Sequence, residues 1–251
     1  MAVGTVRDLD AYQKDYGLLP FEATQSRYRK RKIVESLTRY HPRSILEIGC
    51  GLDPIFAHYA DFAQMVVVEP GDAFARHARE LARARTGISV VHGTLEDSAE
   101  ALARTPYDFI ILSSLLHEVA NADALLRATA TLCSSATVVH VNVPNALSFH
   151  RLLAREMGLI GDLKERSDVQ QRMQQSRTFD LETLSELVVD NGFEVVEQGT
   201  FFIKPFTHAQ MSVLQADGLL TDRMLDGLYG LSVAFPDNGS EIYMNLQRGA
   251  K

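Results

Sequence analysis

The stretch Ile45-Leu46-Glu47-Ile48-Gly49-Cys50-Gly51-Leu52-Asp53-Pro54 decides the fold. A short apolar run ends in two glycines separated by one residue, a pattern typical of a buried strand that turns tightly into a helix. Asp53 suits the N-cap of that helix, and Pro54 suits its first position. In an open parallel sheet, ligands bind beyond the carboxyl ends of the strands. This turn is therefore predicted to lie at a binding site, where glycine lets a ligand approach the backbone.

Further strand-like segments follow, and amphipathic helical stretches separate them. They lack strict polar alternation, which indicates strands that are buried on both faces of a parallel sheet. Repeated strand–helix units predict right-handed crossovers and a doubly wound, mostly parallel α/β sheet. Toward the end of the chain, a strand running from Phe193 toward Ile203 and another at 241–246 could pair antiparallel at one edge. The preceding strands are expected at Ser44–Ile48, Met65–Val68, Ile88–His92, Phe109–Leu112 and Ala136–Val143.

Two segments lie outside this alternation. Residues 1–43 are predicted to form one or two helices that cap an α/β domain spanning residues 44–251. Residues 145–179 are predicted to form a polar helical insertion after the fifth strand. Long insertions beside a ligand-binding crevice often act as lids, and a lid is the function that we expect for this one.

Composition restricts the class of protein and its partners. The chain has 251 residues, which suits one α/β domain, and its net charge of −7 argues against binding to nucleic acid or anionic lipid. No apolar run approaches the roughly 20 residues that a membrane-spanning helix needs. The first ten residues lack the apolar stretch of a signal peptide. We therefore expect a cytoplasmic protein, monomeric or homodimeric, that acts on a small molecule.

A second acidic residue helps to identify the ligand. Glu69 ends the next strand, 18 residues after Gly51, where a carboxylate can accept hydrogen bonds from both hydroxyl groups of a ribose. A dinucleotide-binding turn would require a third glycine or an alanine where Pro54 stands, and Asp53 would repel a pyrophosphate. A ligand without phosphates fits better. Glu47, at the end of the first strand, suits a ligand that carries an amino group or a positive charge.

Several segments together resemble the successive motifs of class I S-adenosylmethionine-dependent methyltransferases. The order and the intervals match over roughly residues 40–250. The run Asn142–Ile160 and the segment Phe201–Phe206 are also similar to a bacterial branch of small-molecule type, which does not fix a substrate. The motifs are Glu47–Gly51, Val68–Pro70, His92–Asp97 and Tyr107–Val119.

The resemblance implies a Rossmann-like sheet of seven strands that binds S-adenosylmethionine. Gly49, Cys50 and Gly51 would line the methionine part of the cofactor, with Glu47 near its amino group. Glu69, followed by Pro70, would hold the ribose. Leu95 and Glu96 would contact the adenine, and Ser113 would lie under the sulfonium. Tyr28 and Arg29, from the N-terminal helices, are the candidates to meet the cofactor carboxylate.

The sequence departs from the family pattern at two places. Asp53 replaces the usual third glycine of the turn. The frequent Leu-Glu-His triplet after the fourth strand is Leu116-His117-Glu118 here, so a role for that histidine does not transfer directly. His117 is a candidate general base at the mouth of the crevice, and a histidine that only packs or caps the next helix is the alternative.

Candidate substrate contacts follow the fifth strand. Asn142 and Asn145 are expected on the ligand side of the sheet, and His150 and Arg151 open the insertion, where His150 is a second candidate catalytic residue. Tyr16 in the N-terminal segment is a further candidate. No pair of histidines has metal-ligand spacing, so no metal is expected.

The function predicted from the sequence is methyl transfer to oxygen, nitrogen or carbon of a small acceptor, and an acidic metabolite such as a 2-oxo acid would fit. Two alternatives stay open at this point. One is a nicotinamide-dependent oxidoreductase, against which Pro54 argues. The other is a protein that binds the cofactor without catalysis.

Overall fold

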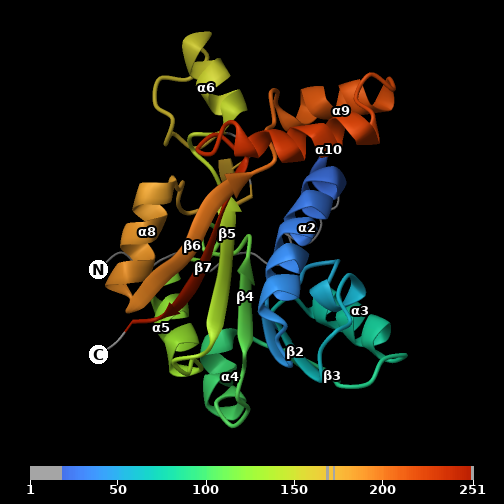
Figure 1. Ribbon diagram of the computed structural model, residues 1–251, viewed down its shortest axis with the longest axis vertical. Helices are drawn as coiled ribbons and strands as arrows, with labels where there is room; N and C mark the ends of the chain where they lie inside the picture. Colours follow the sequence, from blue (N-terminus) through green and yellow to red (C-terminus); the bar gives the residue numbers. More distant parts are fainter. Residues whose placement is uncertain (1–18, 168–169, 172, 250–251) are drawn as a thin grey trace.

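A seven-stranded sheet in the order β3-β2-β1-β4-β5-β7-β6 forms the centre of the molecule (Figure 1). The computed structural model describes residues 19–167, 170–171 and 173–249. Neighbouring strands from β3 to β5 are parallel, whereas β7 pairs antiparallel with both β5 and β6. The predicted doubly wound, mostly parallel sheet with an antiparallel edge is confirmed. Its strands are β1 (Ser44–Ile48), β2 (Gln64–Glu69), β3 (Ile88–His92), β4 (Phe109–Ser113), β5 (Val138–Pro144), β6 (Phe193–Phe201) and β7 (Glu241–Arg248).

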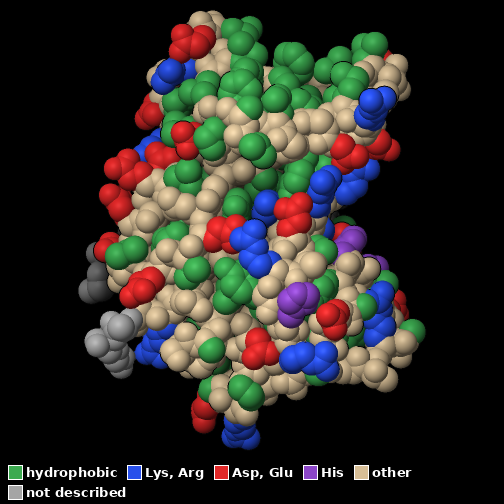
Figure 2. Space-filling model, in the orientation of Figure 1, with side chains coloured by type: hydrophobic (Ala, Val, Ile, Leu, Met, Phe, Trp, Pro, Cys, Tyr) green, Lys and Arg blue, Asp and Glu red, His purple; other side chains and the backbone are tan. Residues whose placement is uncertain are grey.

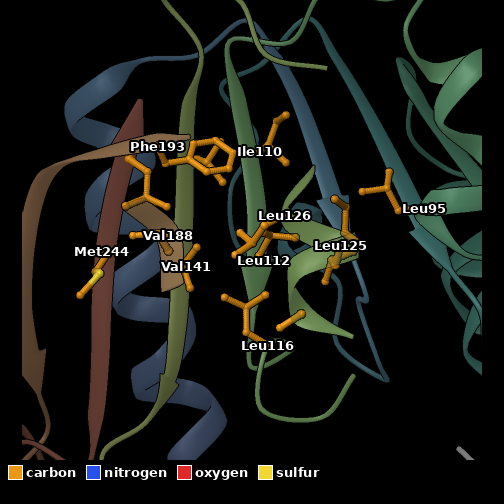
Figure 3. Packing of buried hydrophobic residues seen from close by; sticks show 14 of the residues in the cluster. Leu95, Ile110, Leu112, Leu116, Leu125, Leu126, Val141, Val188, Phe193 and Met244 are labelled. Atoms are coloured by element: carbon orange, nitrogen blue, oxygen red, sulfur yellow. The ribbon is translucent and has the colours of Figure 1, made fainter. Parts of the chain in front are cut away.

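Helices cover both faces of the sheet, and this explains why its central strands are apolar on both sides. On one face lie α4 (Leu95–Leu102), α5 (Ala122–Thr131) and α8 (Leu181–Asp190), whose leucines pack against Leu112, Val141 and other strand residues (Figure 3). On the other face lie α2 (Glu22–Tyr40) and α3 (Asp72–Ala82). All five residues of β1 are buried between these two layers.

The N-terminal helix is part of the same packed unit as the sheet. Ile33 and Leu37 of α2 are fully buried in one cluster with residues of β1, β2 and β4. The beginning of α2 contacts a second group of elements, because Tyr28 stacks on Phe202 with ring centroids 4.5 Å apart. That second cluster includes residues of α9 (His208–Ala216) and α10 (Asp222–Gly230), and a short 3₁₀ helix, η2 (Leu231–Val233), follows α10.

The turn after β1 differs from its prediction in one respect. Only a three-residue 3₁₀ helix, η1 (Ile55–Ala57), follows the glycines, and Pro54 precedes it without a side-chain cap. Both oxygens of the Glu47 carboxylate accept a hydrogen bond from the Ile55 N–H, at 3.0 and 3.2 Å. Asp53 instead binds the His58 ring at 2.7 Å. The expectation that Asp53 caps the following helix is therefore wrong, because the buried Glu47 carboxylate accepts the hydrogen bond from the Ile55 N–H at the start of η1.

The two ends of the insertion at residues 145–179 lie side by side, because Asn145 and Phe179 form an isolated β-bridge. Within it, α6 (Phe149–Glu156) leads into an irregular segment. Arg151 fastens this segment through hydrogen bonds to the carbonyl oxygens of Leu163 and Glu165. The helical character expected for the insertion is thus limited, over its described residues, mainly to α6.

Hydrophobic side chains gather on the surface at the end of the molecule formed by α6, α9 and α10 (Figure 2). Met157 and Leu159 in the insertion, and Leu219 and Val233 around α10, are each more than half exposed. Among the described residues, no helix is both long enough and apolar enough to cross a membrane.

Candidate active site

A cavity of about 520 Å³ lies at the carboxyl ends of β1, β2 and β4. Its walls are the glycine turn after β1, the ends of β2 and β4 with the loops that follow them, the start of α4, and the first half of α2. The volume is within the range of about 300–1,000 Å³ that is usual for small-molecule sites. The cavity therefore stands where the sequence places the ligand.

The glycine turn exposes bare backbone to this cavity. Gly49 and Gly51 have φ angles of 73° and 57°, in the left-handed region that favours glycine. The Gly49 N–H donates to the Val68 carbonyl oxygen at 2.8 Å, which ties the turn to β2. A Cβ atom on Gly51 would have no heavy atom of the protein within 4 Å. The space beside Gly51 is thus open to a ligand.

Glu69 stands at the end of β2 beside the turn. Its carboxylate accepts hydrogen bonds from the backbone N–H groups of Gly71 at 2.8 Å and Gly51 at 3.1 Å. Burial raises the pKa of the Glu69 carboxyl group above its ordinary value, while these N–H groups act in the opposite direction. A carboxylate has about four acceptor positions, so capacity remains for the hydroxyl groups of a ribose. This fits the nucleoside part of S-adenosylmethionine.

Most of the residues predicted to contact the cofactor come together at this cavity. Pro70 continues the wall from β2, and Leu95 and Glu96 form the wall at the first turn of α4, where Thr94 caps the helix. Ser113 closes the floor at the end of β4. The predicted residues that line the cavity are Arg29, Gly49, Cys50, Gly51, Glu69, Pro70, Leu95, Glu96 and Ser113.

Glu47 is not among the lining residues. Its side chain is 1% exposed, and its carboxylate is bound by the Ile55 N–H, with the Lys30 ammonium 3.8 Å away. Burial raises the pKa of Glu47 to about 7, and the charge of Lys30 opposes this rise. Glu47 therefore holds the turn in shape, and its contact with the cofactor amino group, which the family resemblance implied, stays a prediction.

Asn142 supports the cavity floor and is also absent from the wall. Its Oδ1 accepts hydrogen bonds from Ser113 Oγ at 3.1 Å and from the Ser114 N–H at 3.0 Å. Its Nδ2 donates to His140 Nε2, so His140 carries its proton on Nδ1 and donates to Asn245 Oδ1 at 2.8 Å. Burial lowers the pKa of His140 to about 4, consistent with this neutral ring. The side chain predicted to contact substrate is thus used to position Ser113 and Ser114.

Replacing Asn142 with alanine is expected to lower the free energy of unfolding by about 2 kcal/mol, because polar groups on Ser113 and His140 lose their partner, whereas the Ser114 N–H keeps its hydrogen bond to the backbone carbonyl oxygen of residue 142. Chemical denaturation measures this change. The matched control is Asn191→Ala at the less buried end of α8, for which a loss of about 1 kcal/mol is expected. Equal losses for the two variants would contradict the positioning role of Asn142.

The order of His117 and Glu118 has a structural consequence. The His117 side chain is 2% exposed and lies away from the cavity wall, whereas Glu118 lines the cavity together with Ser114 and Leu115. Their side chains approach each other at 3.7 Å between His117 Nε2 and Glu118 Oε1. The carboxylate therefore occupies the position on the wall that was predicted for the histidine. The alternative noted for His117, a histidine packed beside the following helix, agrees better with this placement.

Three other candidates also lie away from the cavity wall. Asn145 donates hydrogen bonds to the carbonyl oxygens of Asp237 and Gly239, which fixes the base of the insertion. Arg151 is bound to the insertion backbone, and His150 lies in a separate buried region beside Lys204. These residues shape the insertion or its base, which explains why they are absent from the lining. The described part of the insertion contributes no residue to the cavity wall.

In the N-terminal segment, Tyr16 lies outside the described residues. Tyr28 is outside the cavity lining, since it stacks on Phe202 and donates to Asp226. Arg29 lines the cavity and is held by Glu22 and Glu241, with N–O distances of 3.1 and 2.6 Å. Lys30, which sequence reasoning did not single out within its basic run, also lines the cavity and donates to the Asp53 carbonyl oxygen.

Carboxylates outnumber cations along the cavity wall. Arg29 and Lys30 are the cations, and both already have carboxylate neighbours at 3.8 Å or less. The excess of negative charge suits a cationic ligand such as a sulfonium and opposes a dinucleotide pyrophosphate. Among the described residues, no group of three or more His, Cys, Asp or Glu could hold a metal ion. The lining carboxylates are Glu22, Asp53, Glu69, Glu96 and Glu118.

The sheet order, its antiparallel β7 and the glycine turn beside Glu69 define a class I S-adenosylmethionine-dependent methyltransferase. The chain belongs to the family described as "Methyltransferase domain", which matches residues 23–198. No curated protein matches the chain in sequence. Family membership favours the methyltransferase over the nicotinamide-dependent oxidoreductase that the sequence had left open.

Solved structures share the fold at low sequence identity. The plantazolicin methyltransferase BamL, in complex with a triazolic desmethylPZN analog and SAH, is 14% identical with a TM-score of 0.61, over 94% of this chain and 91% of that one. A putative sarcosine dimethylglycine methyltransferase from Galdieria sulphuraria is 11% identical with a TM-score of 0.59, over 91% and 87%. The [4+2]-cyclase SpnF is 14% identical with a TM-score of 0.57, over 88% and 80%. At these identities the likeness establishes the fold alone.

Proposed function

We propose that this methyltransferase acts on a small acidic acceptor, such as a 2-oxo acid or a related biosynthetic intermediate. The observation that carries the small-molecule assignment is the cavity, which encloses the predicted cofactor contacts and continues to Leu19, Glu22, Ser114 and Glu118. A net charge of −7 opposes a nucleic acid acceptor. We place the protein in the cytoplasm as a monomer or a homodimer.

Two of the structural neighbours support a small acceptor. BamL was solved in complex with a desmethylPZN analog, and the Galdieria protein is named for sarcosine and dimethylglycine, which are small carboxylates. Because these likenesses concern the fold, they give a precedent for a small acceptor.

When bound, S-adenosylmethionine supplies an electrophilic methyl group on a positively charged sulfur. The Gly49–Gly51 turn and Glu69 would hold the cofactor, and Leu95 and Glu96 would contact its base. Ser113 and Ser114, fixed from below by Asn142, form the floor over which the acceptor must lie. Glu118, a carboxylate on the wall, would take the proton from the atom of the acceptor that is methylated.

Incubation of the protein with methyl-labelled S-adenosylmethionine and a pool of metabolites tests the proposal. We expect label in the fraction that is retained by an anion exchanger, and mass spectrometry then identifies the product. Label confined to neutral or basic products would overturn the acidic acceptor. Tight binding of the cofactor without turnover on any fraction would favour the non-catalytic alternative.

A further inference from the structure

Three nitrogen-bearing side chains lie outside the cavity wall and are here called the basic cluster: the buried Lys204 and the half-buried His150 and His208. Lys204 lies just beyond the end of β6, His208 begins α9, and His150 lies in the first turn of α6. These segments meet at the end of the sheet toward which β5 and β6 run, beside the start of α2 (Figure 1). The basic cluster is thus at the same edge of the sheet as the cavity.

The basic cluster adjoins the cavity through α2. Lys204 is close enough to Glu22 and Arg29, which both line the cavity, for their charges to affect its pKa. His208 packs against Phe21, the residue before α2, with ring centroids 6.0 Å apart. The basic cluster thus lies beside the first turn of α2, whose Glu22 and Arg29 line the cavity.

The nitrogens of the cluster lack partners among the described residues. Lys204 is 5% exposed, and no hydrogen bond or ion pair joins its ammonium to the part of the chain that the structure describes. His150 Nδ1 and His208 Nε2 are buried atoms without a hydrogen-bond partner there. Buried polar groups are nearly always hydrogen-bonded, because leaving one unpaired costs about 1–3 kcal/mol. Two such imidazole nitrogens beside the buried Lys204 indicate that a ligand completes them.

The charges around the cluster identify the kind of ligand. Burial lowers the pKa of Lys204 to about 7; the charges of Glu22 and Glu241 oppose this, and that of Arg29 adds to it. Burial, together with the charge of Lys204, holds the pKa values of His150 and His208 well below their ordinary value. His208 and Arg151 lower the pKa of His150 further, and Arg29 lowers that of His208 further. Glu22 and Glu241 are themselves bound by Arg29. The cluster thus presents donors without an anion of its own.

We infer that the basic cluster binds the acidic group of the acceptor, with Lys204 and the two imidazoles donating hydrogen bonds to a carboxylate or a phosphate. This inference rests on the proposed function and names the residues that select an acidic substrate. An anion in this place would supply the missing acceptors and would favour the charged form of Lys204.

Titration of the protein, saturated with SAH, with acetate and with inorganic phosphate tests the inference. The imidazole nitrogen signals of His150 and His208, assigned with the variants H150N and H208N, should shift with a dissociation constant on the order of 1 mM for at least one anion. The anion that binds more tightly distinguishes a carboxylate acceptor from a phosphorylated one. Signals that stay unchanged for both anions would overturn the inference.

The variant Lys204→Met should weaken binding of the same anion by about tenfold to a hundredfold, because a charged donor is lost. The matched control is Lys32→Met, which removes a lysine that is paired with Glu35 on α2 and lies outside the cavity lining. Anion affinity should be unchanged in this control. Equal effects of the two variants would contradict a specific site at Lys204.

Thermal unfolding separates ligand binding from a structural role of Lys204. Because its ammonium is buried without a bonded partner among the described residues, Lys204→Met should keep or raise the melting temperature without ligand. A lower melting temperature would mean that Lys204 serves to neutralise Glu22 and Glu241, and would overturn the inference. SAH should bind the variant as it binds the unaltered protein, so failure of the anion site and failure of the cofactor site are distinguishable.

Discussion

Replacing Glu69 with glutamine is expected to weaken SAH binding by roughly a hundredfold or more. One carboxylate oxygen becomes an amide that faces the N–H group of Gly51 or Gly71, and the hydrogen bonds that the charged group would accept from the ribose are lost. Hydrogen bonds to a charged group are worth about 1.5–3 kcal/mol each, and about 1.4 kcal/mol corresponds to a tenfold change in affinity. Isothermal titration calorimetry measures the loss.

Glu100→Gln provides the control for this variant. Glu100 is an exposed glutamate on α4 that lies outside the cavity lining, so the substitution makes the same chemical change without touching the site. SAH should bind this control with unaltered affinity. A Glu69→Gln protein that remains folded and binds SAH as tightly as Glu100→Gln would show that Glu69 does not hold the ribose.

Gly51→Ala is the second change with a large expected effect, and it should separate binding from folding. The left-handed backbone at φ 57° makes any side chain there unfavourable by about 1–2 kcal/mol, but the added Cβ meets no protein atom within 4 Å. The new methyl group would occupy space that the cofactor needs beside the turn. We expect a loss of SAH affinity of at least tenfold, with only a modest decrease in stability.

Gly218→Ala is a close match for this experiment. Gly218 has a φ angle of 72°, its Cβ would also meet nothing within 4 Å, and it lies outside the cavity lining, in the turn after α9. Denaturation should therefore show similar losses of stability for the two variants, while calorimetry should show a loss of SAH affinity for Gly51→Ala alone. Parallel behaviour in both measurements would indicate that Gly51 contributes only to the fold.

The fold was predictable because its decisive features are local. Each parallel strand is a short apolar run, and the glycine turn combines a backbone requirement with a position at the end of a strand. Asp180 opens α8 as predicted, with a capping box that it forms with Thr183. Most of the residues predicted to contact the cofactor line the cavity, because they lie in backbone turns and at strand ends whose positions the sheet order determines.

The predicted site residues that are absent from the cavity lining have side chains whose direction depends on tertiary contacts. Glu47 and Asn142 have the residue types of ligand contacts, but a free amide at Ile55 and the backbone at Ser114 take up their oxygens first. For His117 and Glu118, a shift of one residue decides which side chain reaches the cavity. Lys204 lies in the segment Phe201–Phe206 that the resemblance includes, but the sequence gives it no role, because its neighbours come from α2, α6, α9 and β7.

The central claim is that the glycine turn and Glu69 form a site for S-adenosylmethionine at the carboxyl ends of β1 and β2. Calorimetric titration of the unaltered protein with SAH, followed by the same titration with NADH, tests it most directly. We predict one SAH bound per chain with a dissociation constant on the order of 1–100 μM, and no binding of NADH. Binding of NADH together with no heat from SAH at about millimolar concentration would contradict the account.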